Sequence, residues 1–250
     1  MLTNVSNAAL QVVFVTGPDD DELLDAFYRE VYLPEFRHQR EPVEVWKARL
    51  ADASAPYALS IAIAGAELRD PSRRRLDGGV VCELYPVSGC GFLTYLVVAP
   101  AARRAGLGRR LFGQARRALA EQAAARGVEL ALIFAEVSDP ARQDGVAAAA
   151  AWRRLAQFGR WGAGVLDVPY VQPSLGEGLG RDRELLLLAF FEQALPEHVD
   201  GAHVAAFLRE LYVATEGRAD DHEVTAMLDA ISARVIVRPC GAVSQAWDGR

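Results

Sequence analysis

The residues best suited to chemistry lie in one segment, Leu96 to Leu111, which reads Leu-Val-Val-Ala-Pro-Ala-Ala-Arg-Arg-Ala-Gly-Leu-Gly-Arg-Arg-Leu. Pro100 ends a strand, because proline cannot donate to a ladder and restricts the residue before it. Gly106 and Gly108 then remove side chains where the chain turns into a helix, so successive backbone N–H groups can face one concavity. Such a nest at a helix amino terminus binds phosphate oxygens through oriented donors and the helix dipole. The segment therefore predicts a phosphate-binding loop between a strand and a helix.

Two other phosphate-binding motifs do not fit this segment. A dinucleotide fingerprint needs three glycines in a different spacing and an acidic residue about 20 residues later. A Walker loop needs Gly-Lys-Ser or Gly-Lys-Thr, and the segment contains neither. The remaining alternative is a tight turn with no ligand, which is disfavoured because basic residues, two glycines and an apolar helix occur together.

The same segment resembles the GNAT superfamily of N-acetyltransferases. The family signature Arg/Gln-x-x-Gly-x-Gly/Ala is met by Arg103, Gly106 and Gly108, and Leu96 to Pro100 is similar to the family's strand ending in Val-x-Pro. The resemblance implies acetyl-coenzyme A as co-substrate, with its pyrophosphate held by backbone groups of the loop and its pantetheine arm paired with the end of the strand. The implied cofactor-binding residues are Val97, Val98, Arg103, Arg104, Ala105, Gly106, Leu107, Gly108 and Arg109.

Two positions depart from the family pattern. Arg104 stands where many relatives carry another glycine, which leaves the core motif intact. In the helix whose members often read Ala-x-x-x-Tyr-x-x-x-Gly-Phe, Trp152 occupies the place of the tyrosine, and tryptophan cannot donate a hydroxyl proton to a departing thiolate. Tyr170, in the run of residues 165–171 that we expect to be a strand, is the substitute candidate for the general acid.

Direct acetyl transfer to an amine needs a base, because an ammonium group must lose a proton before it attacks. Glu136 is the first candidate, since it follows the apolar run Val128 to Ala135, and strand ends of open α/β sheets collect ligands. Glu83, which interrupts another apolar strand, is the second candidate. For both residues the alternative is a carboxylate that faces solvent. Tyr95 can face either the core or a substrate groove, and we expect the core.

The elements that position these residues alternate along the chain. Apolar runs predict strands, and helical periodicity predicts helices between them. The expected strands are residues 10–16, 57–64, 79–85, 92–98, 128–137, 165–171 and 184–191. The expected helices are residues 19–32, 43–53, 108–126 and 147–158. This order is similar to the GNAT fold and predicts an α/β (α+β) fold, with a mixed, mostly antiparallel central sheet flanked by helices.

The character of the chain changes after Pro196. Two amphipathic helices, residues 201–215 and 222–233, and a short strand-like run after them are expected there. We therefore expect a catalytic domain over residues 1–194 and a small, mainly helical extension over residues 195–250. The apolar stripe of the first extension helix needs a partner, either the sheet domain or a second subunit, so a homodimer is one of two options.

Composition argues against several classes of function. The 250 residues carry a formal net charge of −6 at pH 7, so the basic excess that nucleic-acid binding needs is missing. The three cysteines have no metal-like spacing, and no Ser-His-Asp or metal-ligand set is readable. No segment reaches the roughly 18 apolar residues of a membrane helix. We expect a cytoplasmic protein that binds no metal, nucleic acid or membrane.

The leading hypothesis is transfer of an acetyl group from acetyl-coenzyme A to an amine of a small molecule, peptide or protein by direct attack. A non-catalytic acyl-coenzyme A sensor or assembly subunit is the alternative, which the tryptophan in place of the tyrosine keeps open. A transferase for a longer acyl group is a third hypothesis. Neither the acceptor nor the acyl chain length can be predicted from these motifs.

Overall fold

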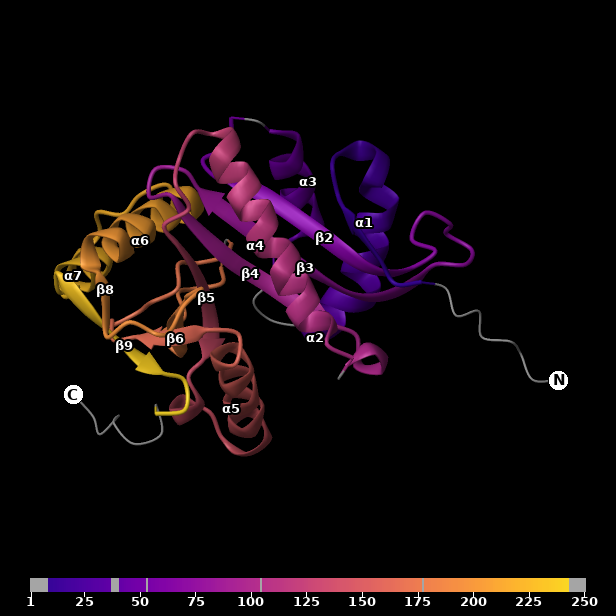
Figure 1. Cartoon of the computed structure of the whole chain (residues 1–250). Coiled ribbons are helices and arrows are strands. Elements are labelled where there is room, and N and C mark those ends of the chain that lie inside the picture. Colours follow the sequence, from indigo (N-terminus) through magenta and orange to yellow (C-terminus); the bar gives the residue numbers. More distant parts are fainter. Residues whose placement is uncertain (1–8, 37–40, 53, 104, 177, 243–250) are drawn as a thin grey trace. The chain divides into compact units, whose positions relative to one another are not determined.

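The computed structural model describes residues 9–36, 41–52, 54–103, 105–176 and 178–242 (Figure 1). The chain divides into two compact units. The first unit comprises Met1–Cys82 and Tyr95–Ala118, and the second comprises Glu83–Thr94 and Leu119–Arg250. Among the described residues, no helix is both long and apolar enough to cross a lipid bilayer.

The first unit contains β1, β2 and parts of β3 and β4, which lie in the order β1–β2–β3–β4 and whose remaining residues belong to the second unit. Their bounds are β1 (Gln11–Phe14), β2 (Ala58–Ala66), β3 (Arg75–Tyr85) and β4 (Cys90–Val98). β1 pairs antiparallel with β2, from Gln11↔Gly65 to Phe14↔Ala62. The helical elements are η1 (Pro18–Asp20), α1 (Asp21–Phe27), η2 (Tyr28–Tyr32), α2 (Leu33–Glu35), α3 (Val43–Ala51), η3 (Pro100–Ala102) and α4 (Leu107–Ala125).

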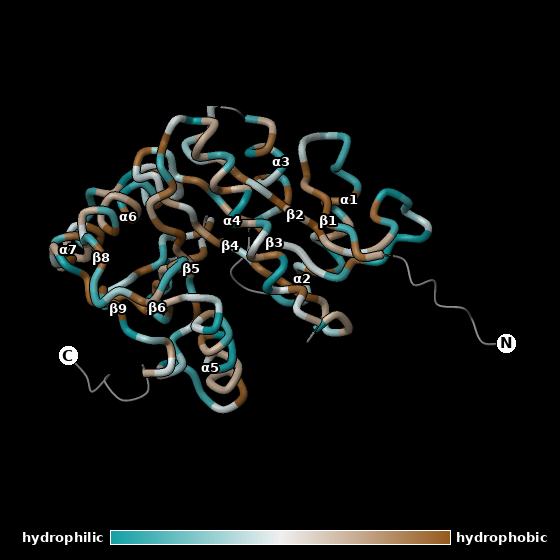
Figure 2. Tube along the Cα trace, viewed as in Figure 1, coloured by the Kyte–Doolittle hydropathy of each residue, from teal (hydrophilic) through white to brown (hydrophobic). Residues whose placement is uncertain are grey.

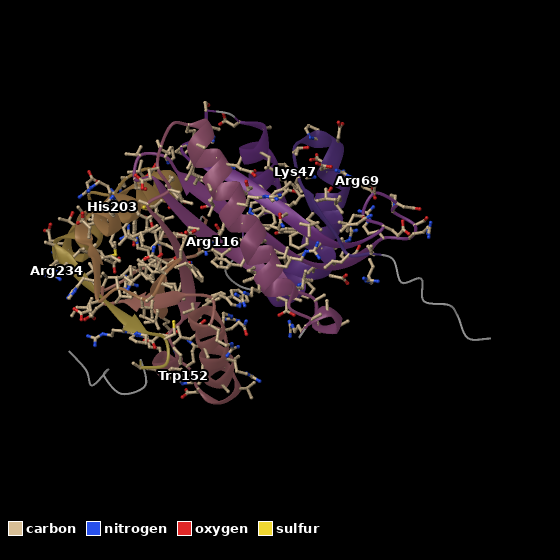
Figure 3. All side chains as sticks on the ribbon, in the orientation of Figure 1. Lys47, Arg69, Arg116, Trp152, His203 and Arg234 are labelled. Atoms are coloured by element: carbon tan, nitrogen blue, oxygen red, sulfur yellow. The ribbon has the colours of Figure 1, made fainter. Side chains whose placement is uncertain are left out.

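Helices α1 and α3 of the first unit form where the sequence places an apolar face opposite charged residues. On α1, Leu24 and Phe27 are fully buried, as expected for residues one turn apart on the core side of an amphipathic helix. On the polar side, Lys47 of α3 forms an ion pair with Asp25 of α1 at 2.6 Å (Figure 3). Burial of the apolar faces, rather than this half-buried pair, supplies most of the stabilisation.

The strands of the second unit lie in the order β4–β5–β7–β6–β9–β8. The further elements are β5 (Leu132–Ser138), η4 (Pro140–Arg142), α5 (Gly145–Gly159), β6 (Ala163–Leu166), β7 (Leu185–Phe190), β8 (His198–Asp200), α6 (Gly201–Glu216), α7 (His222–Asp229) and β9 (Arg234–Pro239). β4 and β5 are parallel, from Cys90↔Leu132 to Leu93↔Ala135. The β5–β7, β6–β7, β6–β9 and β8–β9 pairs are antiparallel. The predicted fold class, a mostly antiparallel mixed sheet flanked by helices, is confirmed.

The extension after residue 195 contributes strands as well as helices. β9 pairs with β6 from Gly164↔Pro239 to Leu166↔Val237, and β8 pairs with β9. Asp200 caps α6 by accepting from the Ala202 N–H at 2.9 Å, and Gly217, at φ 76°, ends α6 in the left-handed conformation that glycine adopts easily. The expected short strand is therefore part of the sheet, and the three-residue strand β8 is an element that the sequence pattern did not predict.

Apolar and polar residues alternate along α6, as the brown and teal segments of Figure 2 show. Phe207 of α6 is fully buried and stacks on Phe134 of β5 with ring centroids 4.4 Å apart. Its ring centroid also lies 5.6 Å from that of Phe92 of β4 and 5.4 Å from that of Tyr85 of β3. The apolar stripe predicted on this helix thus packs on one face of the sheet in the second unit.

Three expected strand boundaries are wrong. β3 begins at Arg75, four residues earlier than expected, where Arg75 forms an ion pair with Asp77 at 2.9 Å. β5 begins at Leu132 rather than at Val128, because the Val128 N–H bonds the Ala123 carbonyl at the end of α4 and cannot join a ladder. β6 ends at Leu166. Local apolar composition does not reveal which backbone groups are already paired within a turn.

Candidate active site

Residues 96–111 form the end of a strand, a loop and the start of a helix in the first unit. β4 ends at Val98, η3 begins at Pro100, and α4 begins at Leu107. The Arg110 N–H donates to the Gly106 carbonyl at 3.2 Å, one helical turn back. The N–H groups of the three residues before Arg110 therefore have no acceptor inside the helix. They are the oriented donors that an anion needs.

The charge of the loop suits an anion as well. The first turn of α4, which is described completely, contains no acidic residue, whereas α1 carries two there and α3 and α7 carry one each. Arg109 and Arg110 are exposed in that turn. Carboxylates normally favour helix amino termini, so arginines at this position leave the positive end of the helix dipole free for another anion.

The backbone at Gly106 has the open geometry that the sequence predicted. Its φ is 76°, and a Cβ at this position would have no described heavy atom within 4 Å. Gly108, by contrast, is an ordinary helical residue without a positive φ. The donors, the arginines and the open surface at Gly106 together fit a pyrophosphate. Arg104 lies outside the described residues.

Arg103 has a second role that the motif alone did not show. Its Nε donates to the Val98 carbonyl at 3.1 Å, and its guanidinium forms an ion pair with Glu35 of α2 at 2.6 Å. The side chain thus ties the loop to the end of β4 and to α2. The Val98 carbonyl already accepts this bond, and main-chain pairing of Val97 and Val98 with a pantetheine arm stays a prediction.

Tyr95, for which the sequence allowed either a core or a groove position, belongs to the core of the first unit. Only 6% of its surface is exposed. Its ring centroid lies 4.9 Å from that of Tyr32 and 5.8 Å from that of Trp46. Trp46 also donates through Nε1 to Glu41 at 3.0 Å, and burial raises the pKa of Glu41 above its usual range. The expected core position of Tyr95 is confirmed.

The candidate carboxylates lie in the second unit, on the face of the sheet that α6 covers. In β4 and β5, Phe92 is paired with Phe134, and both rings contact Phe207. Side chains alternate along a strand, so Glu136, two residues after Phe134, points to the same face. Glu83 shares this face with Tyr85, which also contacts Phe207.

Glu136 is held by two donors from outside its strand. The Tyr170 hydroxyl donates to Oε1, and the Gln172 amide donates to Oε2 at 2.5 Å. Burial raises the pKa of Glu136 to about 7, although the hydrogen bonds from Tyr170 and Gln172 favour the charged form and lower the pKa. Each carboxylate oxygen has a second lone-pair position. The side chain is half-buried, so Glu136 can still accept a proton near neutral pH.

Tyr170 does not lie in a strand, and the expectation that it does is wrong. β6 ends at Leu166, after which the Val168 and Tyr170 N–H groups each bond the carbonyl two residues back, at 3.0 and 2.8 Å. Pro169 between them cannot join a ladder. Burial and the neighbouring Glu136 carboxylate raise the pKa of Tyr170 well above its ordinary value. This environment disfavours donation to a thiolate, whose ordinary pKa is about 8.5, and favours a role in holding Glu136.

Glu83, the second candidate base, is 4% exposed. The Tyr85 hydroxyl donates to its Oε2 at 2.7 Å. A carboxylate this deeply buried has less access to a substrate amine than half-buried Glu136. Trp152, which replaces the family's tyrosine, lies on α5 and is half-buried (Figure 3).

Sequence reasoning missed Gln172 as a functional residue. Gln172 is buried and reaches Glu136 because its backbone forms an antiparallel bridge with Asp182. No local pattern marks such a bridge, since its two residues are ten positions apart in a segment without regular secondary structure. The only available signal was the polar residue between Val171 and Pro173, which turn composition alone also explains.

Solved structures to which this chain is similar include two chains described as GNAT-family proteins. A chain from Bacteroides thetaiotaomicron assigned to the GNAT family is 18% identical, with a TM-score of 0.49 over 72% of this chain and 88% of that chain. A GNAT-family chain from Desulfovibrio desulfuricans is 19% identical, with a TM-score of 0.45 over 73% and 98%. N-acetylglutamate synthase from Neisseria gonorrhoeae, complexed with coenzyme A and N-acetyl-glutamate, is 16% identical, with a TM-score of 0.42 over 72% and 35%.

The family comparison covers the loop and the strands that carry Glu83 and Glu136. No curated protein sequence matches the chain. Residues 24–143, just under half of the chain, match the family model described as the acetyltransferase (GNAT) family. The resemblance predicted from Arg103, Gly106 and Gly108 is confirmed by this match, which includes all three residues. Within residues 24–143, this chain is similar to the GNAT acetyltransferases.

Proposed function

We propose that this protein is an N-acetyltransferase that moves an acetyl group from acetyl-coenzyme A to an amine by direct attack, with Glu136 as the proton acceptor. Glu136 carries the proposal, because its pKa of about 7 suits a base that works at neutral pH. An ordinary glutamate, with a pKa near 4.3, would be a much weaker base. The acceptor is a small molecule or peptide with an amine.

The loop between η3 and α4 is assigned to the coenzyme A pyrophosphate. First-turn N–H groups of α4 would donate to phosphate oxygens, and Arg109 and Arg110 would add positive charge. Acetyl-coenzyme A, when bound, would supply a thioester-activated acetyl group and a thiolate leaving group that water can protonate to the thiol. Glu136 would take the proton that the amine loses as its nitrogen bonds the acetyl carbon. Tyr170 and Gln172 would keep the carboxylate oriented during this transfer.

Coenzyme A is expected to raise the melting temperature of the protein. A ligand that binds only the folded state stabilises it by about 2.7 kcal/mol at a hundredfold excess over its dissociation constant. Differential scanning fluorimetry with coenzyme A measures the shift. Pantetheine, which lacks the pyrophosphate, serves as the control and should give a much smaller shift. No shift with millimolar coenzyme A would contradict the whole assignment.

Replacing Gly106 with valine is expected to weaken coenzyme A binding about tenfold or more. A β-branched residue at φ 76° is strained by roughly 1–3 kcal/mol, and relief of that strain turns the N–H groups of the loop away from the ligand. Gly113→Val is the matched control, because Gly113 also has open space around its Cβ position but lies inside α4. Isothermal titration calorimetry compares the two. Equal affinities in folded variants would exclude the loop as the binding site.

A non-catalytic acyl-coenzyme A sensor is the second candidate function. The observation that favours it is Trp152, which cannot act as the family's tyrosine acid. A panel of amines scored by thiol release separates the two functions. Acetyl-coenzyme A binding without thiol release for any amine would favour the sensor.

A further inference from the structure

The two donors that hold Glu136 lie in a segment whose described residues, 167–176 and 178–184, form no helix or strand. Residues 167–184 connect β6 and β7, and Pro169 and Pro173 interrupt any ladder around Tyr170 and Gln172. The segment has few hydrogen bonds of its own, among them the bridge between Gln172 and Asp182. The geometry at Glu136 must therefore depend on what the segment is anchored to.

One anchor is Tyr212 of α6. Its hydroxyl donates to the Val171 carbonyl at 2.7 Å, and Val171 is the residue between the two donors. Tyr212 is fully buried, so its ring is fixed by packing and its hydroxyl holds one position. The extension thus holds the backbone of the segment at the residue between Tyr170 and Gln172.

The second anchor is Arg181. Gln172 and Asp182 exchange backbone hydrogen bonds of 2.8 and 3.2 Å. The position of the Gln172 backbone therefore depends on what holds the residues around Asp182. Arg181 forms ion pairs with Glu216 at the end of α6 and with Asp221 and Glu223 at the start of α7. These charge-assisted bonds raise the pKa of Arg181 and lower those of its three partners.

Further contacts join the same elements. The Arg181 guanidinium lies 5.0 Å from the centroid of the Tyr212 ring, which is within cation–π range. Glu216 also accepts from the Ser174 N–H at 2.8 Å. Three carboxylates from one corner of the extension therefore hold both sides of the segment that carries Tyr170 and Gln172.

We infer that Tyr212 and Arg181 are positioning residues, through which the C-terminal extension holds Tyr170 and Gln172 on the Glu136 carboxylate. The inference rests on the proposed function in calling Glu136 the proton acceptor. Neither residue touches Glu136 itself in the observed hydrogen-bond network. Their role is to fix how strongly the two donors favour the charged carboxylate, and so to set the pH at which Glu136 accepts a proton.

The titration of Glu136 also depends on other groups around it. Burial and the charge of Asp182 raise its pKa, and the hydrogen bonds from Tyr170 and Gln172 lower it. Tyr212 of α6 contributes to raising the pKa of Tyr170. Glu83 of β3 lies on the same face of the sheet as Glu136. Loosening the segment weakens the two hydrogen bonds that favour the charged carboxylate, so the pKa of Glu136 should rise above about 7.

Tyr212→Phe tests the inference with the smallest change, because it keeps the ring and removes only the hydroxyl. The pKa of the Glu136 carboxyl is measured by infrared difference titration, with Glu136→Gln used to assign the band. We expect the pKa of Glu136 to rise by roughly 1. At a given pH well below the pKa, about tenfold less of the Glu136 side chain would then be ionised than in the wild type. Arg181→Lys keeps the positive charge but loses the planar fork, and should shift the pKa in the same direction.

Glu210→Gln is the matched control on the same helix. The Glu210 carboxylate accepts from the Val87 and Ser88 N–H groups at 2.9 and 2.8 Å, so the variant loosens α6 from the β3–β4 turn without touching the segment. It should leave the Glu136 titration unchanged. Unshifted titrations in folded Tyr212→Phe and Arg181→Lys, or an equal shift in Glu210→Gln, would overturn the inference.

The same set of variants separates this inference from the proposed function. Wild-type turnover in Glu136→Gln would refute Glu136 as the base, yet the Tyr212→Phe titration would still report whether the extension positions its donors. Where both hold, the acidic limb of the pH–rate profile should move upward with the titration in Tyr212→Phe, while coenzyme A affinity stays unchanged.

Discussion

Replacing Glu136 with glutamine is expected to lower turnover about 10²- to 10⁴-fold, the usual contribution of a positioned general base. The amide keeps the shape of the side chain and loses its basicity. Thiol release from acetyl-coenzyme A, assayed with an amine found in a panel screen, measures the loss. Activity should recover partly at high pH, because an amine with a pKa near 10.4 is then increasingly neutral and needs no base.

The same substitution should change how stability depends on pH. The folded pKa of Glu136 is about 7 and its ordinary value is 4.5, so the folded state binds more protons between these values. Stability therefore falls as pH rises through this window. Glu136→Gln has no such titration and should show a flatter stability profile between about pH 4.5 and 7, measured by urea unfolding.

Glu129→Gln provides the control for a lost carboxylate in the same unit. Glu129 is exposed, and its replacement should leave both turnover and the pH profile unchanged. A Glu136→Gln variant with wild-type turnover and an unshifted profile would instead direct attention to Glu83 or to bulk water as the proton acceptor. Unchanged coenzyme A affinity shows that the cofactor site is intact in each variant.

The strand, loop and helix around Gly106 could be predicted from sequence because their determinants are local. Pro100 ends regular pairing, Gly106 permits a positive φ, and the apolar spacing of α4 predicts its length to within one residue at each end. Amphipathic helices such as α6 were predictable for the same reason, since periodicity depends only on residues within a few turns.

The surroundings of Glu136 could not be predicted because they depend on pairing between distant segments. Its position at a strand end was visible, but its two donors come from residues 34 and 36 positions later. Tyr170 and Gln172 reach Glu136 because the chain leaves β6 at Leu166 and bridges to Asp182. Single-sequence periodicity assigned residues 165–171 to a strand, since apolar content outweighed the effect of Pro169.

Phe207 of the extension packs on strands that precede the domain boundary expected near residue 194. Its ring is fully buried and contacts Phe134, Phe92 and Tyr85. Helix α6 is thus joined to the strands of the second unit through a shared aromatic core. Whether the extension unfolds separately can be tested by truncating this ring.

Phe207→Ala is expected to lower the free energy of unfolding by about 3–5 kcal/mol, because it removes the transfer energy of a buried ring and leaves a cavity against Phe134. Val213→Ala is the control on the same helix, since Val213 is 48% exposed and its truncation should change stability by no more than about 0.5 kcal/mol. Urea unfolding is followed by circular dichroism and by hydrogen exchange of β5 and α6 amides. If α6 and β5 share one cooperative core, Phe207→Ala raises exchange in both elements together. A loss below about 1 kcal/mol, or faster exchange confined to α6, would show that the extension is a separable appendage and that its packing does not stabilise the strand that carries Glu136.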